Sequence, residues 1–539
     1  MKLNKIEKLK LNLRPYDFYE KLDSLEPSVL KEADRFYLKN FGIYGTKLNP
    51  DVFMLRLRIT GGRIDLFKLK KILQLTKEYK AKIILTSRSQ MELHGLDFYS
   101  AVKIHKELEK VGISSWQTLT DNFRNIVTDP LDGISEESVF EVYPIILQME
   151  SLFLKNPYFT GMIPRKFNTA VSANVKNISS FFSNDCYFAL AQKDNEIGFN
   201  LYLGGRNLAV SKNSNIFVKK DDVVSVFRAV IFAYKKYGLR ESRSKARLYH
   251  LLEKVGMEEF KRMMREFYEK EFEEGGETLA QKVENEKEWF LLKDGSYAYR
   301  YKSRFGEIDA KELENITNYA LDKGCSLRLG TDQNLYIIGL KNKEFPYLSS
   351  FENALTLVCA GSKYCIYSLF DTKEEAGRLI LSDIKRLGIK VGYSGCLKGC
   401  ARHILADIGF VGIRTTVFGK LERGVRLYLG GLYTKGKAEA RLIYWAIPLR
   451  GLNDILRVIF DEFENSGFDD FEEFSEKILN NYRVEFLAFW FLAKLYTKKR
   501  IYLGEGEEKL IKKFEEFDFY DKVDETLYDV IKYLEKKCF

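Results

Sequence analysis

One stretch of this chain occurs twice, and this duplication limits the possible folds more than any other feature. Residues 51–96 align without gaps with residues 295–340, at a constant offset of 244 residues. A second, shorter echo joins LYLGG at 201–205 to LYLGG at 427–431. A period this long does not fit a solenoid, so we interpret it as the duplication of a whole module. The matched positions are Phe53 with Tyr297, Arg56 with Arg300, Gly62 with Gly306, Ile64-Asp65 with Ile308-Asp309, and Gly95 with Gly339.

Each copy shows the same order of secondary-structure signals. In the first copy, the alternating run FMLRLRI predicts a strand, Gly61-Gly62 a turn, and LFKLKKILQLTKEY a helix. The run IILTSRSQMELHGL then predicts two strands joined by an exposed step. Each half therefore predicts a small β-α-β unit followed by a larger mixed α/β unit. Two related halves also predict a cleft between them that could hold a large ligand.

The two copies differ in their chemically active residues. Arg88 of the first copy corresponds to Asp332 in the second, and His94 corresponds to Ile338. The second half alone carries a cluster of four cysteines, between Cys359 and Cys400. We expect one half to supply cationic side chains and the other to supply thiols, with a ligand between them.

Composition excludes several classes of protein. With 539 residues and 45% apolar residues, the chain is predicted to be ordered and to form several domains. The net charge of +10 could attract an acidic protein or anionic ligands, and we find no nucleic-acid recognition motif. The N-terminus lacks a secretory apolar region, and the apolar run at 484–496 is too short to span a bilayer. We expect a soluble, cytoplasmic protein that binds neither nucleic acid nor membranes.

The four clustered cysteines form two pairs, Cys359-x5-Cys365 and Cys396-x3-Cys400. Clustered cysteines in a cytosolic chain indicate metal binding or catalysis sooner than disulfides. The x5 spacing is longer than the x2–4 spacing of structural zinc sites. Four thiolates suit an iron–sulfur cluster. Zinc and plain buried thiols remain the alternatives, and only four histidines are available for any other metal site.

Around these cysteines the chain resembles the siroheme and iron–sulfur reductases of nitrite and sulfite. The family carries Cys-x5-Cys and Cys-x3-Cys and ends in GC-x-x-GCAR…A-x-GFVG, which this sequence follows closely from Gly395 onward. The resemblance implies a [4Fe–4S] cluster on Cys359, Cys365, Cys396 and Cys400, with Cys400 also the axial ligand of the siroheme iron. Leu397 and Lys398 replace the usual proline and asparagine, and Lys398 could tune the cluster or bind a siroheme carboxylate.

Four short motifs resemble those with which the family binds siroheme and substrate. LRLRI places Arg56 at a substrate-side arginine, with Arg58 on the same strand face, and Thr60 replaces a common proline. LTSRSQMELHG places Arg88 and His94 at cofactor-binding positions, with Glu92 in place of a usual glutamine. DNFRN supplies Arg124 as the second substrate-side arginine, and IPRKFN supplies Lys166. Taken singly, each motif could also be a solvated strand face or a loop.

These residues imply the reduction of a small oxyanion. Arg56, Arg124 and Lys166 would supply positive potential, and Lys166 a proton for each bond cleavage. Sulfite-reducing members usually carry a second lysine where this chain has Asn168. A doubly charged sulfite gains more from that lysine than nitrite does, so Asn168 favours nitrite. The function expected from the resemblance is the six-electron reduction of nitrite to ammonia, with sulfite to sulfide as the alternative.

The resemblance implies an α+β fold with internal duplication: two ferredoxin-like half-domains and two larger mixed α/β domains, related by pseudo-two-fold symmetry. The expected divisions are 1–45 (helical lead-in), 46–110 (first half-domain), 111–235 (first siroheme-binding domain), 236–285 (helical connector), 286–345 (second half-domain), 346–480 (cluster and siroheme domain) and 481–539 (C-terminal helices).

Electrons are expected from an external protein such as an acidic ferredoxin, because the chain lacks a flavin or nicotinamide motif. Two remoter alternatives share the cofactor motifs. One is a cobalamin-pathway monooxygenase that acts on a tetrapyrrole precursor, against which the set of Arg56, Arg124 and Lys166 argues. The other is a non-catalytic subunit that binds the cofactors for structure alone.

Overall fold

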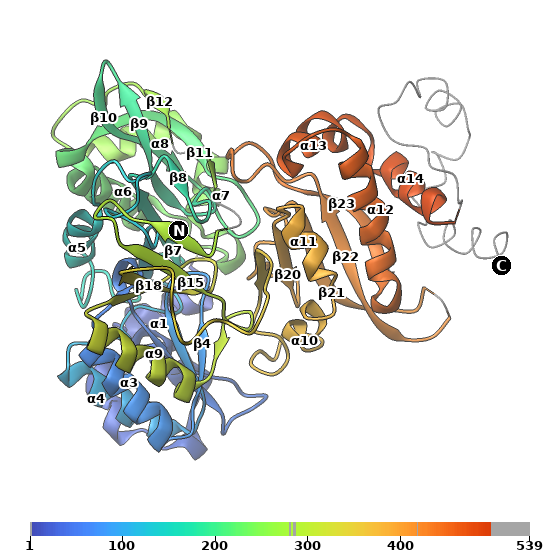
Figure 1. Ribbon diagram of the computed structural model, residues 1–539. Helices are drawn as coiled ribbons and strands as arrows, with labels where there is room; N and C mark the ends of the chain where they lie inside the picture. Colours follow the sequence, from blue (N-terminus) through green and yellow to red (C-terminus); the bar gives the residue numbers. More distant parts are fainter. Residues whose placement is uncertain (1–2, 280–281, 284–286, 418, 497–539) are drawn as a thin grey trace. The chain divides into compact units, whose positions relative to one another are not determined.

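The computed structural model describes residues 3–279, 282–283, 287–417 and 419–496, and the chain divides into two units (Figure 1). The first unit consists of residues up to 206 together with 211–351. The second consists of residues 207–210 and the chain from residue 352 onward. The duplication predicted from the sequence is present both within the first unit and in the comparison of the two units.

The repeated stretches form two sheets of five strands each. The first has the order β1-β2-β5-β4-β16 and the second β14-β15-β18-β17-β3. The strands of the first sheet are β1 (Ile43–Gly45), β2 (Phe53–Leu57), β4 (Lys82–Leu85), β5 (Met91–Leu96) and β16 (Glu307–Ile308). Those of the second are β3 (Arg63–Ile64), β14 (Trp289–Leu291), β15 (Tyr297–Tyr301), β17 (Ser326–Leu329) and β18 (Leu335–Leu340).

The two sheets exchange one short strand. β3 follows the first copy's turn but pairs with β17 of the second copy, and β16 pairs with β4 of the first. The repeated glycines explain the exchange. Gly62 and Gly306 have φ of +75° and +90°, and a Cβ would lie 2.3 Å from the Leu329 carbonyl oxygen and 2.5 Å from that of Leu85, respectively. Only glycine allows this approach of two backbones with a positive φ.

Helices cover these sheets and share their core. α3 (Leu66–Glu78) and α9 (Ala310–Lys323) occupy matching places in the two copies and contact each other (Figure 1). Asp65 and Asp309 cap their first turns by accepting backbone N–H bonds. α4 (Phe98–Lys110) follows β5. Buried side chains of both copies form one hydrophobic cluster, which fixes the two half-domains to each other.

The two larger sheets have the same topology. The first has the order β6-β7-β9-β10-β11, and the second β19-β20-β21-β22-β23. In each, two parallel pairings are followed by two antiparallel ones. Their strands are β6 (Phe123–Val127), β7 (Phe167–Ser172), β9 (Cys186–Lys193), β10 (Glu196–Leu203), β11 (Lys212–Lys219), β19 (Thr356–Val358), β20 (Val391–Ser394), β21 (Ile408–Thr415), β22 (Glu422–Leu429) and β23 (Arg441–Pro448).

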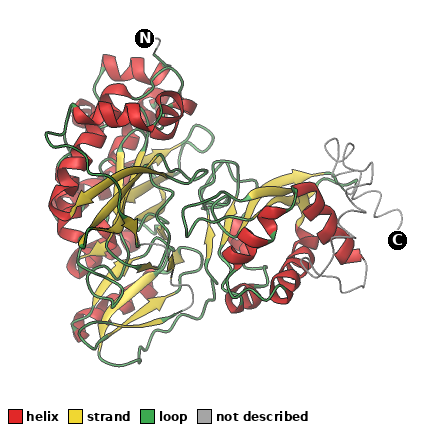
Figure 2. Ribbon diagram, turned by 90° about the horizontal axis from the view of Figure 1, so that it is seen from above, coloured by secondary structure: helices red, strands yellow, loops and turns green. Residues whose placement is uncertain are grey.

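A long helix follows the last strand of each larger sheet: α6 (Val223–Tyr237) in the first unit and α12 (Leu452–Asn465) in the second. In the second unit the helices lie on one side of the sheet (Figure 2). The remaining helices are α1 (Lys5–Asn12), α2 (Glu32–Leu38), α5 (Tyr143–Ser151), α7 (Leu248–Val255), α8 (Met257–Arg265), α10 (Thr372–Ala376), α11 (Leu381–Arg386), α13 (Phe471–Lys477) and α14 (Val484–Tyr496), with short 3-10 turns between several of them.

The segment expected to be a helical connector, 236–285, is helical only in its first part. α7 and α8 are followed by the short strands β12 (Glu277–Thr278) and β13 (Lys282–Val283). β12 pairs with β9, and the side chain of Asn200 donates to the carbonyl of Gly276 at 2.7 Å. The two glycines before β12 let the chain lie against this sheet. In the expected C-terminal segment, residues 497–539, including Lys498, Lys499, Arg500 and Cys538, lie outside the described residues.

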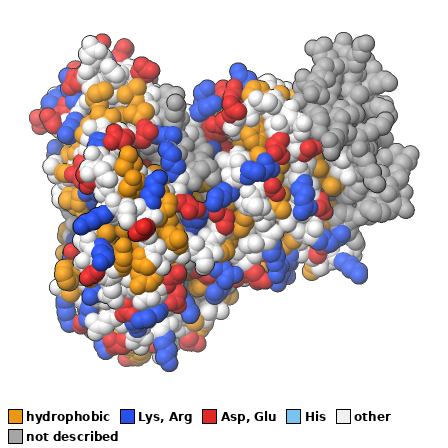
Figure 3. Space-filling model, viewed as in Figure 1, with side chains coloured by type: hydrophobic (Ala, Val, Ile, Leu, Met, Phe, Trp, Pro, Cys, Tyr) orange, Lys and Arg blue, Asp and Glu red, His pale blue; other side chains and the backbone are white. Residues whose placement is uncertain are grey.

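No helix within the described ranges is long and apolar enough to cross a membrane. On the face seen in Figure 3, Lys and Arg side chains are interspersed with Asp and Glu over both units.

Candidate functional sites

The predicted site residue Arg124 meets two further charged residues at the N-terminal ends of two parallel strands. β6 and β7 pair in parallel with Phe123 opposite Phe167. The residues just before and just inside these strands therefore lie side by side, which brings Asp121 and Arg124 close to Arg165. Arg165 forms an ion pair with Asp121 at 3.1 Å.

Arg124 is the centre of this group. It is buried, and its Nη2 donates to the carbonyl of Thr120 at 2.8 Å. Its Nε and Nη1 are buried with no hydrogen-bond partner among the described residues. Burial lowers the pKa of Arg124 far below its usual range, and the nearby charges of Arg56, Arg165 and Arg88 lower it further. A buried guanidinium with open donors and like charges around it is suited to an anion.

The first half-domain adds Arg56, Glu92 and His94. Arg56 on β2 lies opposite Glu92 on the neighbouring strand β5. Its Nε donates to Oε1 of Glu92 at 2.8 Å, and Nε2 of His94 lies 2.8 Å from Oε2. Burial would raise the pKa of Glu92, but the charge of Arg56 and the contacts with His94 outweigh it and hold the pKa at about 2. Glu92 is therefore ionised at neutral pH.

Arg88 extends from the β4–β5 hairpin to the larger sheet. The hairpin turn places Ser89 in the left-handed region, with φ of +51°. The Nη1 of Arg88 donates to Oδ1 of Asn184 at 2.9 Å, and Nη2 donates to the carbonyl of Asn125 at 2.6 Å. These contacts fasten the hairpin to β6 and fix the direction of the guanidinium.

Lys166 and Asn168 lie on either side of the start of β7. Lys166 is partly exposed and Asn168 is buried. The backbone N–H of Asn168 donates to Oδ2 of Asp185 at 2.8 Å, and Asp185 forms a buried ion pair with Arg247. This contact fixes the backbone at Asn168.

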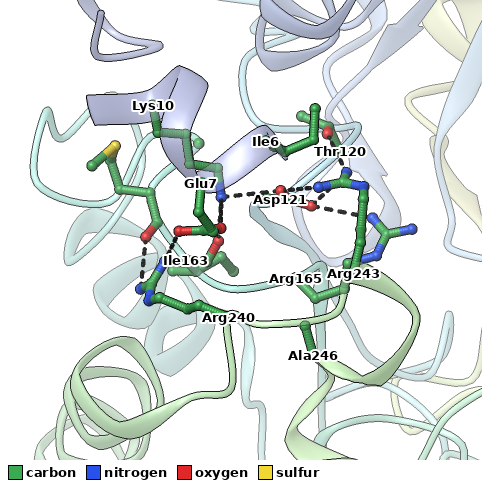
Figure 4. A network of polar contacts seen from close by, with 12 residues as sticks. Ile6, Glu7, Lys10, Thr120, Asp121, Ile163, Arg165, Arg240, Arg243 and Ala246 are labelled. Atoms are coloured by element: carbon green, nitrogen blue, oxygen red, sulfur yellow. Dashed lines mark hydrogen bonds and ion pairs between the residues drawn. The ribbon is translucent and has the colours of Figure 1, made fainter. Parts of the chain in front are cut away.

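A network of ion pairs around Asp121 holds Arg165 and Arg243 in place (Figure 4). Asp121 is fully buried and pairs with three cations: Arg165, Arg243 at 2.6 Å and Lys10 at 3.0 Å. Burial would raise the pKa of Asp121, but Lys10, Arg243 and Arg165 hold it at about 2. Lys10 also pairs with Glu7, which in turn pairs with Arg240. Helix α1 is thus tied to the cationic group.

Most residues of this network were not predicted from the sequence. Arg165 precedes Lys166 in IPRKFN, and Asp121 begins DNFRN, so both were open to prediction from motifs already singled out. Lys10 and Arg243 lie in charged segments that carry no such signal. Arg58, predicted on the same strand face as Arg56, is buried and pairs with Glu150, with its Nη1 2.8 Å from Oε1.

The second unit places its cysteines at the C-terminal ends of parallel strands. Cys359 follows β19, and Cys396 comes two residues after β20, which pairs with β19 in parallel. Parallel strands end at the same sheet edge, so these two thiols lie close together. The backbone N–H of Gly395 donates to Sγ of Cys359 at 3.1 Å, and Oγ1 of Thr372 lies 3.4 Å from the same sulfur.

Close backbone packing holds the loop that carries Cys396 and Cys400. A Cβ at Gly409 of β21 would lie 1.7 Å from the carbonyl oxygen of His403. The loop therefore lies directly on the strand, and any side chain at Gly409 would displace it. His403 is buried, its Nδ1 lies 3.1 Å from Oγ of Ser394, and burial lowers its pKa to about 4.

The remaining thiols lie in the same region. Cys365 is half-buried, and burial raises the pKa of its thiol, to which the neighbouring Cys359 and Cys396 add. Cys400 is exposed. The ammonium group of Lys398 lies 2.9 Å from the centre of the Tyr367 ring. Lys398 is therefore oriented by an aromatic face next to the cysteines.

Within the described part of the chain, no three His, Cys, Asp or Glu side chains converge as ligands of a single metal ion. A [4Fe–4S] cluster makes a different demand, because each thiolate binds a different iron atom and the sulfurs surround the cluster. Cys359 and Cys396 are near enough to Cys365 to act on its charge, and a backbone N–H reaches the sulfur of Cys359, which suits such a cluster. Cys400 lies on the same loop as Cys396. Arg124, with open buried donors, fits an anionic ligand.

Comparisons with known proteins agree with this architecture. The family model "Nitrite/Sulfite reductase ferredoxin-like half domain" matches residues 46–111. The model "Nitrite and sulphite reductase 4Fe-4S domain" matches residues 119–272, which is the first copy of the larger domain. That copy contains Cys186 as its only cysteine, whereas the four clustered cysteines lie in the second copy.

Relatives match over most of the chain. Ferredoxin–nitrite reductase of Synechococcus elongatus is 28% identical over 86% of this chain and 96% of that protein. The chloroplastic ferredoxin–nitrite reductase of Spinacia oleracea is 25% identical over 86% of each. Sulfite reductase [ferredoxin] 2 of Mycolicibacterium paratuberculosis is 25% identical over 71% of this chain and 74% of that protein.

The fold is shared with the NirA protein of Mycobacterium tuberculosis, whose structure has a TM-score of 0.81 and covers 90% of this chain and 97% of that chain at 21% identity. The α+β architecture with ferredoxin-like half-domains and internal duplication is thereby confirmed. Over most of its length the chain is similar to nitrite and sulfite reductases, and two of its segments match domain models of that family.

Proposed function

We propose that this protein is a siroheme- and [4Fe–4S]-dependent reductase that carries out the six-electron reduction of nitrite to ammonia. Its electrons would come from a ferredoxin. The relatives named ferredoxin–nitrite reductase, which match 80–86% of this chain, support the proposal. That the enzyme acts in the cytoplasm and in nitrogen assimilation stays a prediction, as do the domain limits expected from the sequence.

The observation that carries the proposal is the state of Arg124. Its Nε and Nη1 are buried and lack hydrogen-bond partners among the described residues, while Arg56 and Arg165 lie near it. A buried, unpartnered donor is costly unless a ligand accepts from it. A small oxyanion supplies acceptor oxygens and negative charge at once.

When bound, siroheme and a [4Fe–4S] cluster would together supply the electron-transfer chemistry of the reaction. We assign the cluster to Cys359, Cys365, Cys396 and Cys400, with Cys400 also the siroheme ligand. The amide of Gly395 would tune the cluster by its bond to Cys359. Arg88, His94 and Lys398 are assigned to the carboxylates of siroheme.

The residues of the first unit would bind the oxyanion and deliver protons. Arg124 would donate from Nε and Nη1 to its oxygens, and Arg56 would hold one side of it. Lys166, which is partly exposed, would donate a proton as each N–O bond breaks and would be reprotonated from solvent. Asp121 would keep Arg165 in place near Arg124.

Nitrite is favoured over sulfite at one position. Asn168 is neutral, where a second ammonium group would stabilise a doubly charged anion more than a singly charged one. The sulfite reductase among the relatives keeps sulfite as the second candidate.

The proposal is tested on anaerobically purified protein. We expect siroheme absorption bands, one [4Fe–4S] cluster by iron and acid-labile sulfide, and a higher kcat/KM for nitrite than for sulfite with a reduced dye. Turnover of sulfite alone would select the second candidate. Oxygen-dependent modification of a tetrapyrrole without oxyanion turnover would select the monooxygenase alternative, and cofactor bands that neither anion perturbs would indicate a non-catalytic subunit.

Cys400→Ser tests whether Cys400 is a ligand of the cofactors. We expect it to lose the coupled siroheme and cluster spectrum. The matched control is Cys325→Ser, which changes a buried thiol of the second half-domain and should keep the spectrum. An intact spectrum in Cys400→Ser would remove Cys400 from the ligand set. Asn168→Lys should raise the ratio of sulfite to nitrite turnover.

A further inference from the structure

Glu92 is a carboxylate inside a site that otherwise gathers cations. Its side chain is 7% exposed, and it lies on β5 between Arg56 and His94. Both of its oxygens are engaged, Oε1 by Arg56 Nε at 2.8 Å and Oε2 by His94 Nε2 at 2.8 Å. A buried carboxylate with two such partners is held in a fixed position in the site.

The contact with Glu92 changes what Arg56 can offer a ligand. Nε and Nη2 of Arg56 face Glu92, and Nη1 points to the carbonyl of Thr118 at 3.4 Å. The side chain is still 26% exposed, so it remains accessible at its outer edge. Its charge is largely compensated, whereas Arg124 has no carboxylate as a hydrogen-bond partner among the described residues.

We propose that Glu92 is a specificity-determining positioning residue: it orients Arg56 and compensates its charge, so that the site prefers a singly charged oxyanion to a doubly charged one. This inference rests on the proposed function, which supplies the two oxyanions to compare. It names the carboxylate of Glu92 as a second determinant, independent of the neutral side chain at Asn168.

The physical basis is the scaling of Coulomb energy with charge. Each uncompensated cation attracts a dianion about twice as strongly as a monoanion at the same distance. A fixed carboxylate next to the site repels the dianion twice as strongly. Removal of the charge of Glu92 therefore helps sulfite more than nitrite, while a glutamine in its place can still accept from Arg56.

Glu92→Gln in the holoenzyme tests this inference. At alkaline pH, where sulfite is a dianion, we expect the ratio of kcat/KM for sulfite to that for nitrite to rise about tenfold, mainly through a lower KM for sulfite. Equilibrium binding, read from the visible absorption of the oxidised protein, should shift in the same direction. An unchanged ratio and unchanged binding would overturn the proposal.

A second variant distinguishes charge from packing. Glu92→Asp keeps the charge but shortens the side chain, so it should leave the selectivity ratio near that of the wild type. A purely structural role would give the reverse order, because glutamine matches the shape of glutamate better than aspartate does. A shift of the ratio in Glu92→Asp equal to that in Glu92→Gln would therefore contradict the proposal.

Glu150→Gln is the matched control. Glu150 forms the other buried ion pair with an arginine of this strand region, but Arg58 is enclosed by it and by the carbonyls of Gln117 and Phe123. Its loss should lower stability and leave the selectivity ratio unchanged. An equal shift in Glu150→Gln would show that any buried charge has this effect, and would overturn the specific assignment to Glu92.

Failure of the proposed function would give different results from failure of the inference about Glu92. If the wild type reduces neither oxyanion, the proposed function fails, and the inference is then judged on binding of sulfate against nitrate. Glu92→Gln should still strengthen sulfate binding relative to nitrate binding. If the wild type reduces nitrite and neither ratio moves in Glu92→Gln, the inference about Glu92 fails alone.

Discussion

The two half-domains have the same backbone and an arginine at the same position, but they use it differently. In the first copy, Arg56 pairs with Glu92 and lies in the group of cations around Arg124. In the second, Nε of Arg300 donates to the hydroxyl of Tyr336 at 2.9 Å, and that hydroxyl donates to Asp332 at 2.7 Å. Tyr336 occupies the position of Glu92, at the offset of 244 residues.

This comparison shows that the strand position alone does not give an arginine its role. Arg300 is 3% exposed and lies beside the ring of Phe290, so it is part of the interior. Arg56 is partly exposed, and its neighbours leave it accessible to a ligand. The side chains at equivalent positions, Glu92 and Tyr336, distinguish the two arginines: Arg56 pairs with a carboxylate and stays partly exposed, whereas Arg300 is bonded to a tyrosine in the interior.

Substitution of the two matched arginines should have the largest effect on activity. Arg56→Met should lower kcat/KM for nitrite about a hundredfold or more, because it removes a cation from the oxyanion and leaves Glu92 uncompensated. Arg300→Met should leave kcat/KM within about threefold of the wild type, because Arg300 only supports the core. Steady-state kinetics of the two purified holoenzymes make the test, and equal losses would refute the division of roles.

A smaller effect concerns acid stability. The pKa of Glu92 falls from its ordinary 4.5 to about 2 in the folded protein. Its contribution to stability is therefore present above about pH 4.5 and is lost as the pH falls toward 2. At neutral pH this amounts to about 3 kcal/mol. Urea unfolding of the wild type and Glu92→Gln at several pH values should show their difference shrinking from about pH 5 to pH 3; a constant difference would contradict the ion pair.

The smallest expected effect is a loss of stability when the hydrogen bond to Arg300 is removed from the second copy. Tyr336→Phe removes the hydroxyl between Arg300 and Asp332 and should lower the free energy of unfolding by about 1–3 kcal/mol. The kinetic constants for nitrite should not change. Urea denaturation measures the loss, and a change in KM without a loss of stability would place the second copy's arginine in the functional site.

The sequence predicted the duplication, because the two copies resemble each other directly, and the order of elements in each half-domain, because that order depends on local periodicity. The four cysteines were identified by their spacing, and their role as cluster ligands stays a prediction. The sequence did not predict the exchange of β3 and β16, which are strands of two residues with no periodic signal of their own. Alternation placed Arg56 and Arg58 on one strand face, but it could not show that Arg58 pairs with Glu150, which lies 92 residues away in sequence.

The ion-pair network around Asp121 shows a second limit. Its partners Lys10 and Arg243 lie more than 100 residues away along the chain, so only the folded structure brings them together. The cysteines show that a motif can be recognised in the sequence although its arrangement in space is not yet known. The spacing identified the four residues, but the meeting of Cys359 and Cys396 depends on the parallel pairing of β19 and β20.

The exchanged strands have a consequence for how the protein is made. During synthesis the first half-domain emerges from the ribosome with one side of β4 open, and it stays open until residues 307–308 have been translated. An exposed strand edge of this kind invites pairing with other nascent chains. Neither half-domain is a complete folding unit, so a truncation after the first one should yield an aggregation-prone product, and completion of the sheet must await the second.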